Sequence, residues 1–195
     1  KSREGTVVDA DDLINQMISK SKEISESLGK INDLSDEERT KLYRTIALGA
    51  LKYHILKVDP KKRILFDPSE SIDFNGNTGP FIQYTYARIQ SLLSKGYDGN
   101  LKNDLYTDFN LKEREIIITL DQFDSILINA YNTLNPSLIA NYTYDLVKQF
   151  NSFYQSHSIV GKQPVNSFRL ALSKKVGDQI KLSMSLLGID CPERM

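Results

Sequence analysis

The sequence is poor in the side chains that build disulfides and metal sites. It has one cysteine, Cys191, and two histidines, His54 and His157, which stand far from each other and from the cysteine. A single cysteine cannot form a disulfide within the chain, and no metal-ligand spacing is present. These absences favour a reducing, cytoplasmic setting and predict that the chain binds no metal.

The sequence also lacks a net charge and a long apolar run. Its 25 Lys and Arg residues balance its 25 Asp and Glu residues, which argues against a protein held to nucleic acid mainly by bulk charge. No apolar run approaches the roughly eighteen residues of a membrane span, so we expect a soluble chain that does not bind membranes. The chain begins with Lys1, without an initiator methionine or a signal peptide, and we expect it to be part of a longer protein.

Apolar residues recur at helical spacing through most of the chain. Ser35 and Glu38 have the spacing of a capping box at one helix start. Gly49 inside that helix predicts the close approach of another backbone, and Gly188 predicts a helix end. The fold class is therefore all-α, a helical bundle with a short extended segment at the N-terminus. The helices are predicted over about residues 9–28, 36–58, 80–95, 111–135, 138–154 and 165–187, with 64–66 as a candidate strand or extended piece and 96–108 as a polar surface connection.

The most informative stretch covers residues 75–95. It opens with loop formers, and Pro80 suits the first position of a helix. Phe81, Tyr84 and Arg88 then recur at intervals of three and four, which places two rings and a guanidinium along one side of the helix. Such a row can stack on unpaired bases and pair with phosphate. The spacing alone leaves open whether the rings instead fill the core and Arg88 is a surface charge.

Residues 76–91, Gly-Asn-Thr-Gly-Pro-Phe-Ile-Gln-Tyr-Thr-Tyr-Ala-Arg-Ile-Gln-Ser, closely resemble a signature of arginyl-tRNA synthetases. Residues 1–8 resemble the tail of the class I Lys-Met-Ser-Lys-Ser loop, 138–154 the DALR-type anticodon-binding helix, and 192–195 the Pro-Glu-Arg-Met close of the family. The name-giving tetrapeptide is here Asp145-Leu146-Val147-Lys148, so this match is one of pattern and place. The chain is identified as the C-terminal part of a member of this family. The resemblance implies a remnant of the signature loop with a connecting helix at 1–35 and an anticodon-binding domain at 36–195.

The resemblance implies a class I arginine–tRNA ligase as the full-length parent. Such an enzyme activates arginine with ATP, accompanied by Mg²⁺, and transfers it to the terminal adenosine of arginine tRNA. Its catalytic core would lie upstream, so this chain would bind tRNA without catalysing the reaction, would hold no cofactor itself, and would belong to a monomer. Lys1, Ser2 and Arg3 would be remnants of the loop that holds the ATP phosphates.

The resemblance also implies a site for the anticodon loop. Bases would be read through stacking and main-chain hydrogen bonds, because Arg88 is the one strong bidentate donor of the set. His157 is expected to be a polar residue at a helix end instead of a base reader. The site residues implied are Phe81, Gln83, Tyr84, Arg88, Tyr154, Ile159 and Met195.

Two other interpretations stay open. The first is that the chain is an enzyme in its own right, although no His-Cys, paired-carboxylate or Ser-His-Asp spacing supports this. The second is that it is a helical protein-interaction module with no role in RNA binding. Aromatic side chains that converge on one exposed surface would favour tRNA binding over the second interpretation.

Overall fold

The computed structural model describes residues 9–28, 31–65, 67–96, 109–159 and 166–195. These residues form helices and no strand, which confirms the all-α class. The predicted extended segment at 1–8 and most of the polar connection at 96–108 lie outside the described residues. The helices are α1 (Ala10–Leu28), α2 (Asp36–Leu56), α3 (Pro68–Ser71), α4 (Gly79–Gly96), α5 (Leu111–Asp121), α6 (Phe123–Thr133), α7 (Ser137–Ser156) and α8 (Ser167–Leu186).

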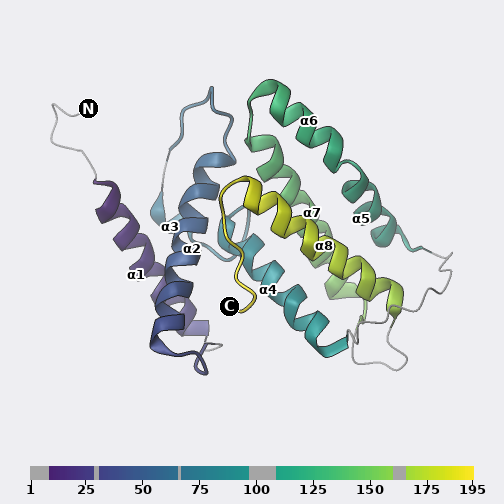
Figure 1. Ribbon diagram of the computed structural model, residues 1–195, viewed down its shortest axis with the longest axis horizontal. Helices are drawn as coiled ribbons and strands as arrows, with labels where there is room; N and C mark the ends of the chain where they lie inside the picture. The colour runs from purple at the N-terminus through teal and green to yellow at the C-terminus, as the bar shows by residue number, and fades with distance from the viewer. Residues whose placement is uncertain (1–8, 29–30, 66, 97–108, 160–165) are drawn as a thin grey trace.

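The helices form an elongated bundle with α4, α7 and α8 at its centre (Figure 1). α5 and α6 pack on α7 at one edge, and α2 packs on α4 toward the other. α1 lies outermost, against α2. After α8 the chain turns back and crosses in front of α4 toward α2 (Figure 1). None of the described helices combines the length and the apolar character that crossing a membrane requires.

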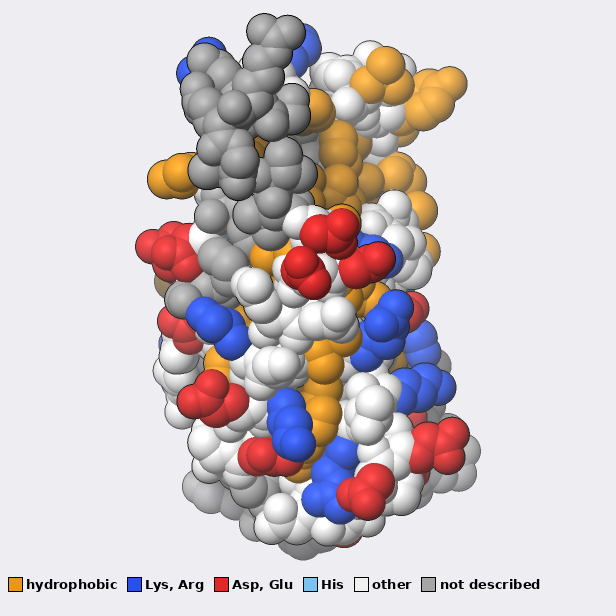
Figure 2. Space-filling model, turned by 90° about the vertical axis from the view of Figure 1, so that its left-hand side faces the viewer, with side chains coloured by type: hydrophobic (Ala, Val, Ile, Leu, Met, Phe, Trp, Pro, Cys, Tyr) orange, Lys and Arg blue, Asp and Glu red, His pale blue; other side chains and the backbone are white. Residues whose placement is uncertain are grey.

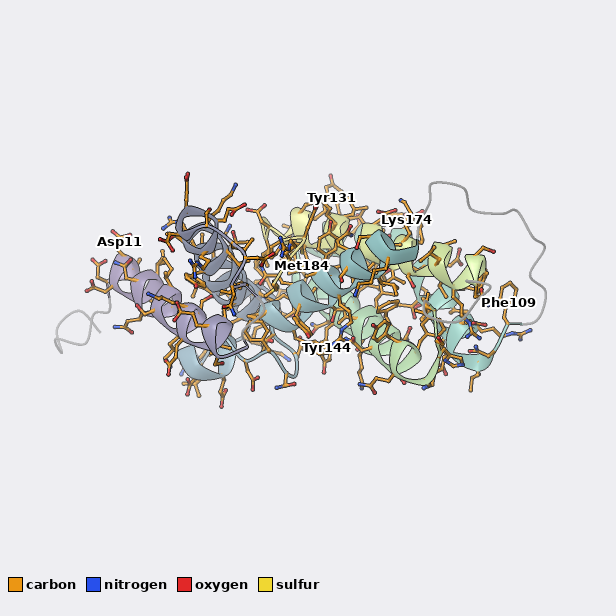
Figure 3. The ribbon with its side chains drawn as sticks, turned by 90° about the horizontal axis from the view of Figure 1, so that it is seen from below. Asp11, Phe109, Tyr131, Tyr144, Lys174 and Met184 are labelled. Atoms are coloured by element: carbon orange, nitrogen blue, oxygen red, sulfur yellow. The ribbon has the colours of Figure 1, made fainter. Side chains whose placement is uncertain are left out.

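The main core lies between the central helices. Phe150, Leu146 and Met184 are fully buried in it, and each such side chain stabilises the fold by about 1.5–3 kcal/mol relative to exposure. Figure 3 shows Met184 in the middle of the bundle, with Asp11 and Phe109 toward its two ends. A smaller cluster of apolar side chains joins α2 to the α1–α2 turn, and Met195 packs against it.

Several helix ends follow from local sequence. Ser35 and Glu38 form the predicted capping box at the start of α2. The Thr78 hydroxyl accepts a hydrogen bond from the Phe81 N–H at 3.3 Å and so caps α4. Gly188 has a φ of 68° and ends α8, because glycine reaches this left-handed conformation without strain.

The close approach predicted at Gly49 is confirmed. A Cβ built on Gly79 would lie 2.4 Å from the Gly49 carbonyl oxygen, and a Cβ on Gly49 would lie 2.4 Å from the Gln83 side-chain nitrogen. Position 79 needs glycine because its neighbour is backbone, whereas a side chain at position 49 would displace the amide of Gln83. The backbone of α2 therefore touches the first turn of α4, which fixes where α4 begins in the bundle.

One predicted helix is interrupted, and the strand alternative for a second predicted element is excluded. The helix predicted over 111–135 is interrupted at Gln122, which ends α5 and precedes α6. Gln122 is a good helix former, so the local sequence does not mark the break; after it, Phe123 is buried with its ring 5.4 Å from the Tyr142 ring. The candidate strand at 64–66 is absent where it is described, because residues 64 and 65 have no regular structure and are exposed, without a strand to pair with.

The domain boundary at residue 35 stays a prediction. α1 and α2 lie on opposite sides of it and pack against each other. The short helix α3 was not predicted; it begins with Pro68, a residue suited to the first helical position.

Candidate functional site

A cleft of about 680 Å³ lies between α4, the last turn of α7 and the C-terminal tail, residues 187–195. Four of the predicted site residues line it together. Tyr84 and Arg88 come from α4, Tyr154 from α7 and Met195 from the tail. Three segments that are far apart in sequence therefore build one concave surface.

α4 presents a single face to this cleft. Tyr84, Arg88, Ser91 and Lys95 line it, and their intervals of three and four place them on one side of a helix. The opposite side of α4 is committed to the core, where Ile82 and Ile89 are fully buried. The spacing predicted from sequence for Tyr84 and Arg88 thus holds, and the core takes up the other face.

Arg88 is held in a fixed orientation at the centre of the cleft. Its guanidinium carbon lies 4.9 Å from the Tyr84 ring centroid and 5.3 Å from that of Tyr154, which is within range of cation–π attraction. Its Nη1 donates a hydrogen bond of 2.6 Å to Asn151 Oδ1, and Asn151 Nδ2 donates one of 2.9 Å to the Thr85 hydroxyl. Arg88 is therefore preorganised by two rings and a neutral amide.

The rings beside Arg88 are partly exposed, and each has a second ring neighbour. The Tyr84 ring meets the Phe74 ring edge-on, with centroids 6.2 Å apart. The Tyr154 ring lies 6.2 Å from the Phe150 ring. Both tyrosines are thus supported on one side while part of each remains open to the solvent, which suits them to stack on a planar ligand.

The charge in the cleft comes mainly from cations. Arg88, Lys95 and Arg194 line it, against the single carboxylate side chain of Glu193. Arg194 also bonds to the exposed carboxylate of Asp33, and this hydrogen bond holds the pKa of Asp33 below its usual range. By contrast, acidic and basic side chains alternate over the end of the molecule that α1 occupies (Figure 2).

The other predicted site residues do not line the cleft. Phe81 is partly buried, with its ring 6.1 Å from the Tyr144 ring. Gln83 and Ile159 are buried in the interior and are not exposed to a ligand. Lys1, Ser2 and Arg3 lie outside the described residues. Burial of Gln83 and Ile159 corrects the expectation that they would face a base.

His157 is a helix-end residue, as expected. It caps the C-terminus of α7, with its N–H donating to the Phe153 carbonyl at 3.0 Å. Its ring stacks on the Phe153 ring, with centroids 5.1 Å apart.

Sequence reasoning missed six of the residues that line the cleft, Ala87, Ser91, Leu92, Lys95, Glu193 and Arg194, and the supporting residue Asn151. Of these, Asn151 orients Arg88 and Lys95 adds a cation. A signal was present for both, because Asn151 lies three residues before Tyr154 and Lys95 lies seven after Arg88, so that each shares a helix face with a predicted residue. In the described parts of the chain, no group of three His, Cys, Asp or Glu side chains could hold a metal ion.

Comparison with known proteins agrees with this geometry. The family model described as the DALR anticodon binding domain matches residues 82–195. The arginine–tRNA ligases of Flavobacterium psychrophilum and Phocaeicola vulgatus are 55% and 52% identical to this chain over its whole length. The chain spans about a third of the length of these relatives, 33% of each.

Solved structures show the same arrangement of helices. The arginyl-tRNA synthetase of Thermus thermophilus superposes with a TM-score of 0.87 at 27% identity, over 97% of this chain and 32% of that one. The synthetase of Plasmodium falciparum superposes with a TM-score of 0.83 at 23% identity, over 97% of this chain and 34% of that one, which supports the fold alone. The family match covers more than half of the 195 residues and includes the cleft-lining part of α4, Tyr154 and the tail, so this chain belongs to the DALR anticodon-binding domain family.

Proposed function

We propose that this chain binds the anticodon loop of arginine tRNA as part of an arginine–tRNA ligase. The observation that carries the proposal is the stack of Tyr84, Arg88 and Tyr154 along one open cleft. Single-stranded RNA is recognised largely by stacking of splayed bases on aromatic rings and guanidinium planes. The names of the relatives, arginine–tRNA ligase, support the choice of tRNA.

The cleft offers three kinds of contact to an RNA loop. The tyrosine rings offer stacking surfaces, and Met195 offers a soft apolar wall that adapts to a base. Arg88 and Lys95 offer positive charge to the loop phosphates. Because the chain as a whole has no net charge, we expect affinity to depend on this local arrangement more than on bulk attraction.

The activity of the whole enzyme belongs to this proposal as well. We expect the parent to be a cytoplasmic monomer that activates arginine with ATP and Mg²⁺ and charges its tRNA. The candidate ATP-loop residues Lys1, Ser2 and Arg3 lie outside the described residues, and we assign no chemical step to this chain. An ATP–pyrophosphate exchange assay on the chain alone is expected to show no activity, and measurable exchange would contradict this assignment.

The test is binding of a labelled anticodon stem-loop of arginine tRNA, followed by fluorescence anisotropy at fixed salt. Tyr84→Ala should weaken binding by about 1–3 kcal/mol through lost stacking, with little change in melting temperature because Tyr84 is only partly buried. Tyr131→Ala is the matched control, since Tyr131 is a 78% exposed tyrosine of α6 outside the cleft. Figure 3 shows it at the edge of the bundle.

A stem-loop with an altered anticodon provides the specificity control. Equal or absent binding of the two RNAs would contradict the proposal and favour the helical protein-interaction module instead. The first surface to examine would then be α6 and its C-cap, where Ile128, Tyr131 and Leu134 are exposed. A collapse of the melting temperature in Tyr84→Ala would instead mean that Tyr84 is a core residue.

A further inference from the structure

The C-terminal tail forms one wall of the cleft, and it is anchored in the interior. It turns at Gly188, after which the Ile189 N–H donates to the Met184 carbonyl at 2.9 Å and the Ile189 side chain is buried in the main core. The tail then crosses in front of α4 (Figure 1). It ends with Met195 in the cleft and against the cluster beside the α1–α2 turn.

Gln83 bonds to this tail from inside the bundle. Its side-chain nitrogen donates to the Asp190 carbonyl at 2.7 Å and to the Thr45 carbonyl of α2 at 3.2 Å. One amide group therefore ties α4 to α2 and to the tail at once. Both acceptors are main-chain oxygens, so the bond to the tail fixes its path whatever side chains the tail carries.

The site of this amide is tightly built. The side chain of Gln83 is fully buried and fills the space that the missing Cβ of Gly49 leaves open. Its oxygen has no hydrogen-bond partner among the described residues. Burying an amide oxygen without a partner is costly, so an apolar side chain would suit a site that served packing alone. The two donated bonds are what distinguish glutamine here.

We propose that Gln83 is a positioning residue for RNA binding, which fixes the tail so that Met195 closes the cleft. This proposal rests on the proposed function, and it assigns Gln83 a role without contact to the ligand. Two exposed contacts support the same path, from Lys52 to the Gly188 carbonyl and from Arg194 to Asp33. Of these three anchors, Gln83 is the one that is buried. Its hydrogen bonds are therefore the least weakened by water.

The chain contains its own reporter of tail position. Cys191 is the only cysteine in the sequence, it follows Asp190 directly, and it packs against the main core. Its alkylation by iodoacetamide should be slow while the tail is docked and fast when the tail is released. The reaction needs no RNA, so it measures anchoring independently of the proposed function.

The experiment compares Gln83→Leu with Ile116→Val in the 195-residue chain. Ile116 is fully buried in α5 and does not line the cleft, so Ile116→Val serves as a control for moderate destabilisation. We expect Gln83→Leu to speed alkylation of Cys191 and to weaken stem-loop binding, each by about tenfold, as for one lost hydrogen bond. Ile116→Val should change neither by more than about twofold, because it acts on overall stability alone.

A double variant distinguishes positioning from a general loss of structure. Met195→Ala should weaken RNA binding, and adding Gln83→Leu should weaken it little further, because both changes remove the same wall. If Gln83→Leu does not fold, Gln83→Met replaces it, because methionine is closer to glutamine in length and also lacks the amide donor.

Unchanged alkylation in the folded Gln83→Leu variant, or in Gln83→Met where that variant replaces it, would overturn the anchoring. Faster alkylation with unchanged RNA affinity, or additive effects in the double variant, would overturn the positioning role. Failure of the unaltered chain to bind the stem-loop would reject the proposed function and the positioning role with it, while the alkylation rates would still decide the anchoring.

Discussion

Adjacent residues of α7, Phe153 and Tyr154, each lie beside an arginine, and the two arginines are held in different ways. At the cleft, Arg88 lies over Tyr154 and bonds to the neutral amide of Asn151. On the other side of α7, Arg169 from α8 lies 5.9 Å from the Phe153 ring centroid. The first arginine is a candidate ligand-binding group, and the second is a structural one.

The partners of the second arginine explain the difference. The Nε of Arg169 lies 2.7 Å from a carboxylate oxygen of Glu113, whose side chain is 0% exposed. The same carboxylate caps α5 by accepting the Asn110 N–H at 3.0 Å. The charge of Arg169 is therefore neutralised within the fold. Among the described residues no carboxylate forms an ion pair with Arg88, so its charge remains available to an anionic ligand.

The largest effect is expected from Arg169→Met. This change leaves the carboxylate of Glu113 buried without its cation, and we expect the free energy of unfolding to fall by about 3–5 kcal/mol. Urea unfolding followed by circular dichroism measures it. A loss below about 1 kcal/mol, the range of exposed pairs, would remove the contrast between the two arginines.

A smaller effect, of a different kind, is expected from Arg88→Met. Stem-loop binding should weaken by about 1.5–3 kcal/mol, the range for a hydrogen bond to a charged group, while the free energy of unfolding changes less than in Arg169→Met. Arg88→Lys should restore the binding only in part, because a lysine cannot stack its charge between two rings in the same way. Anisotropy and urea unfolding on the same preparations separate the two effects; full recovery in the lysine variant would mean that charge alone matters.

Asn151→Asp would give Arg88 a carboxylate partner, as Arg169 has in Glu113. A carboxylate at this position would pair with Arg88, and we expect RNA affinity to fall by about tenfold with a shallower salt dependence, by about one unit of slope. Titrations at several salt concentrations provide the measurement. An unchanged slope would show that Arg88 does not contact a phosphate.

The smallest effect is expected at Cys191, in the C-terminal tail that forms one wall of the cleft. Burial raises the pKa of the Cys191 thiol to about 12. Because the unfolded chain loses this proton at lower pH than the folded chain, the stabilising contribution is complete below about pH 8.5, the ordinary thiol pKa, and is lost as pH rises toward 12. Relative to Cys191→Ala, the chain should lose about 1 kcal/mol between pH 8 and pH 9.5. If the free energies of unfolding of the chain and of Cys191→Ala change in parallel with pH, the thiol is exposed.

Local signals in the sequence predicted most helix ends and two residues of the cleft, Tyr84 and Arg88. The capping box at Ser35, the close contact at Gly49 and the stop at Gly188 depend on residues within a few positions, and all three were predicted. The interruption at Gln122 was not, because no glycine or proline marks it and the surrounding packing decides it.

Periodicity predicted the candidate site only within α4, whereas Tyr154 and Met195 came from the resemblance to the family. The spacing of Tyr84 and Arg88 placed them together without knowledge of the fold. The burial of Gln83 was not predictable, because it depends on a carbonyl 107 positions away in the chain. The pairing of Arg169 with Glu113 likewise joins residues 56 positions apart, and no periodicity carries that information.

The location of the last residue has a practical consequence for work on this protein. Met195 lines the cleft and packs beside the α1–α2 turn, so a purification tag or fluorescent protein fused after it would emerge at the mouth of the proposed RNA site. Such a fusion would obstruct the RNA or pull the tail from its place. Attachment before residue 9, beyond the outermost helix, keeps the added sequence away from that opening (Figure 1).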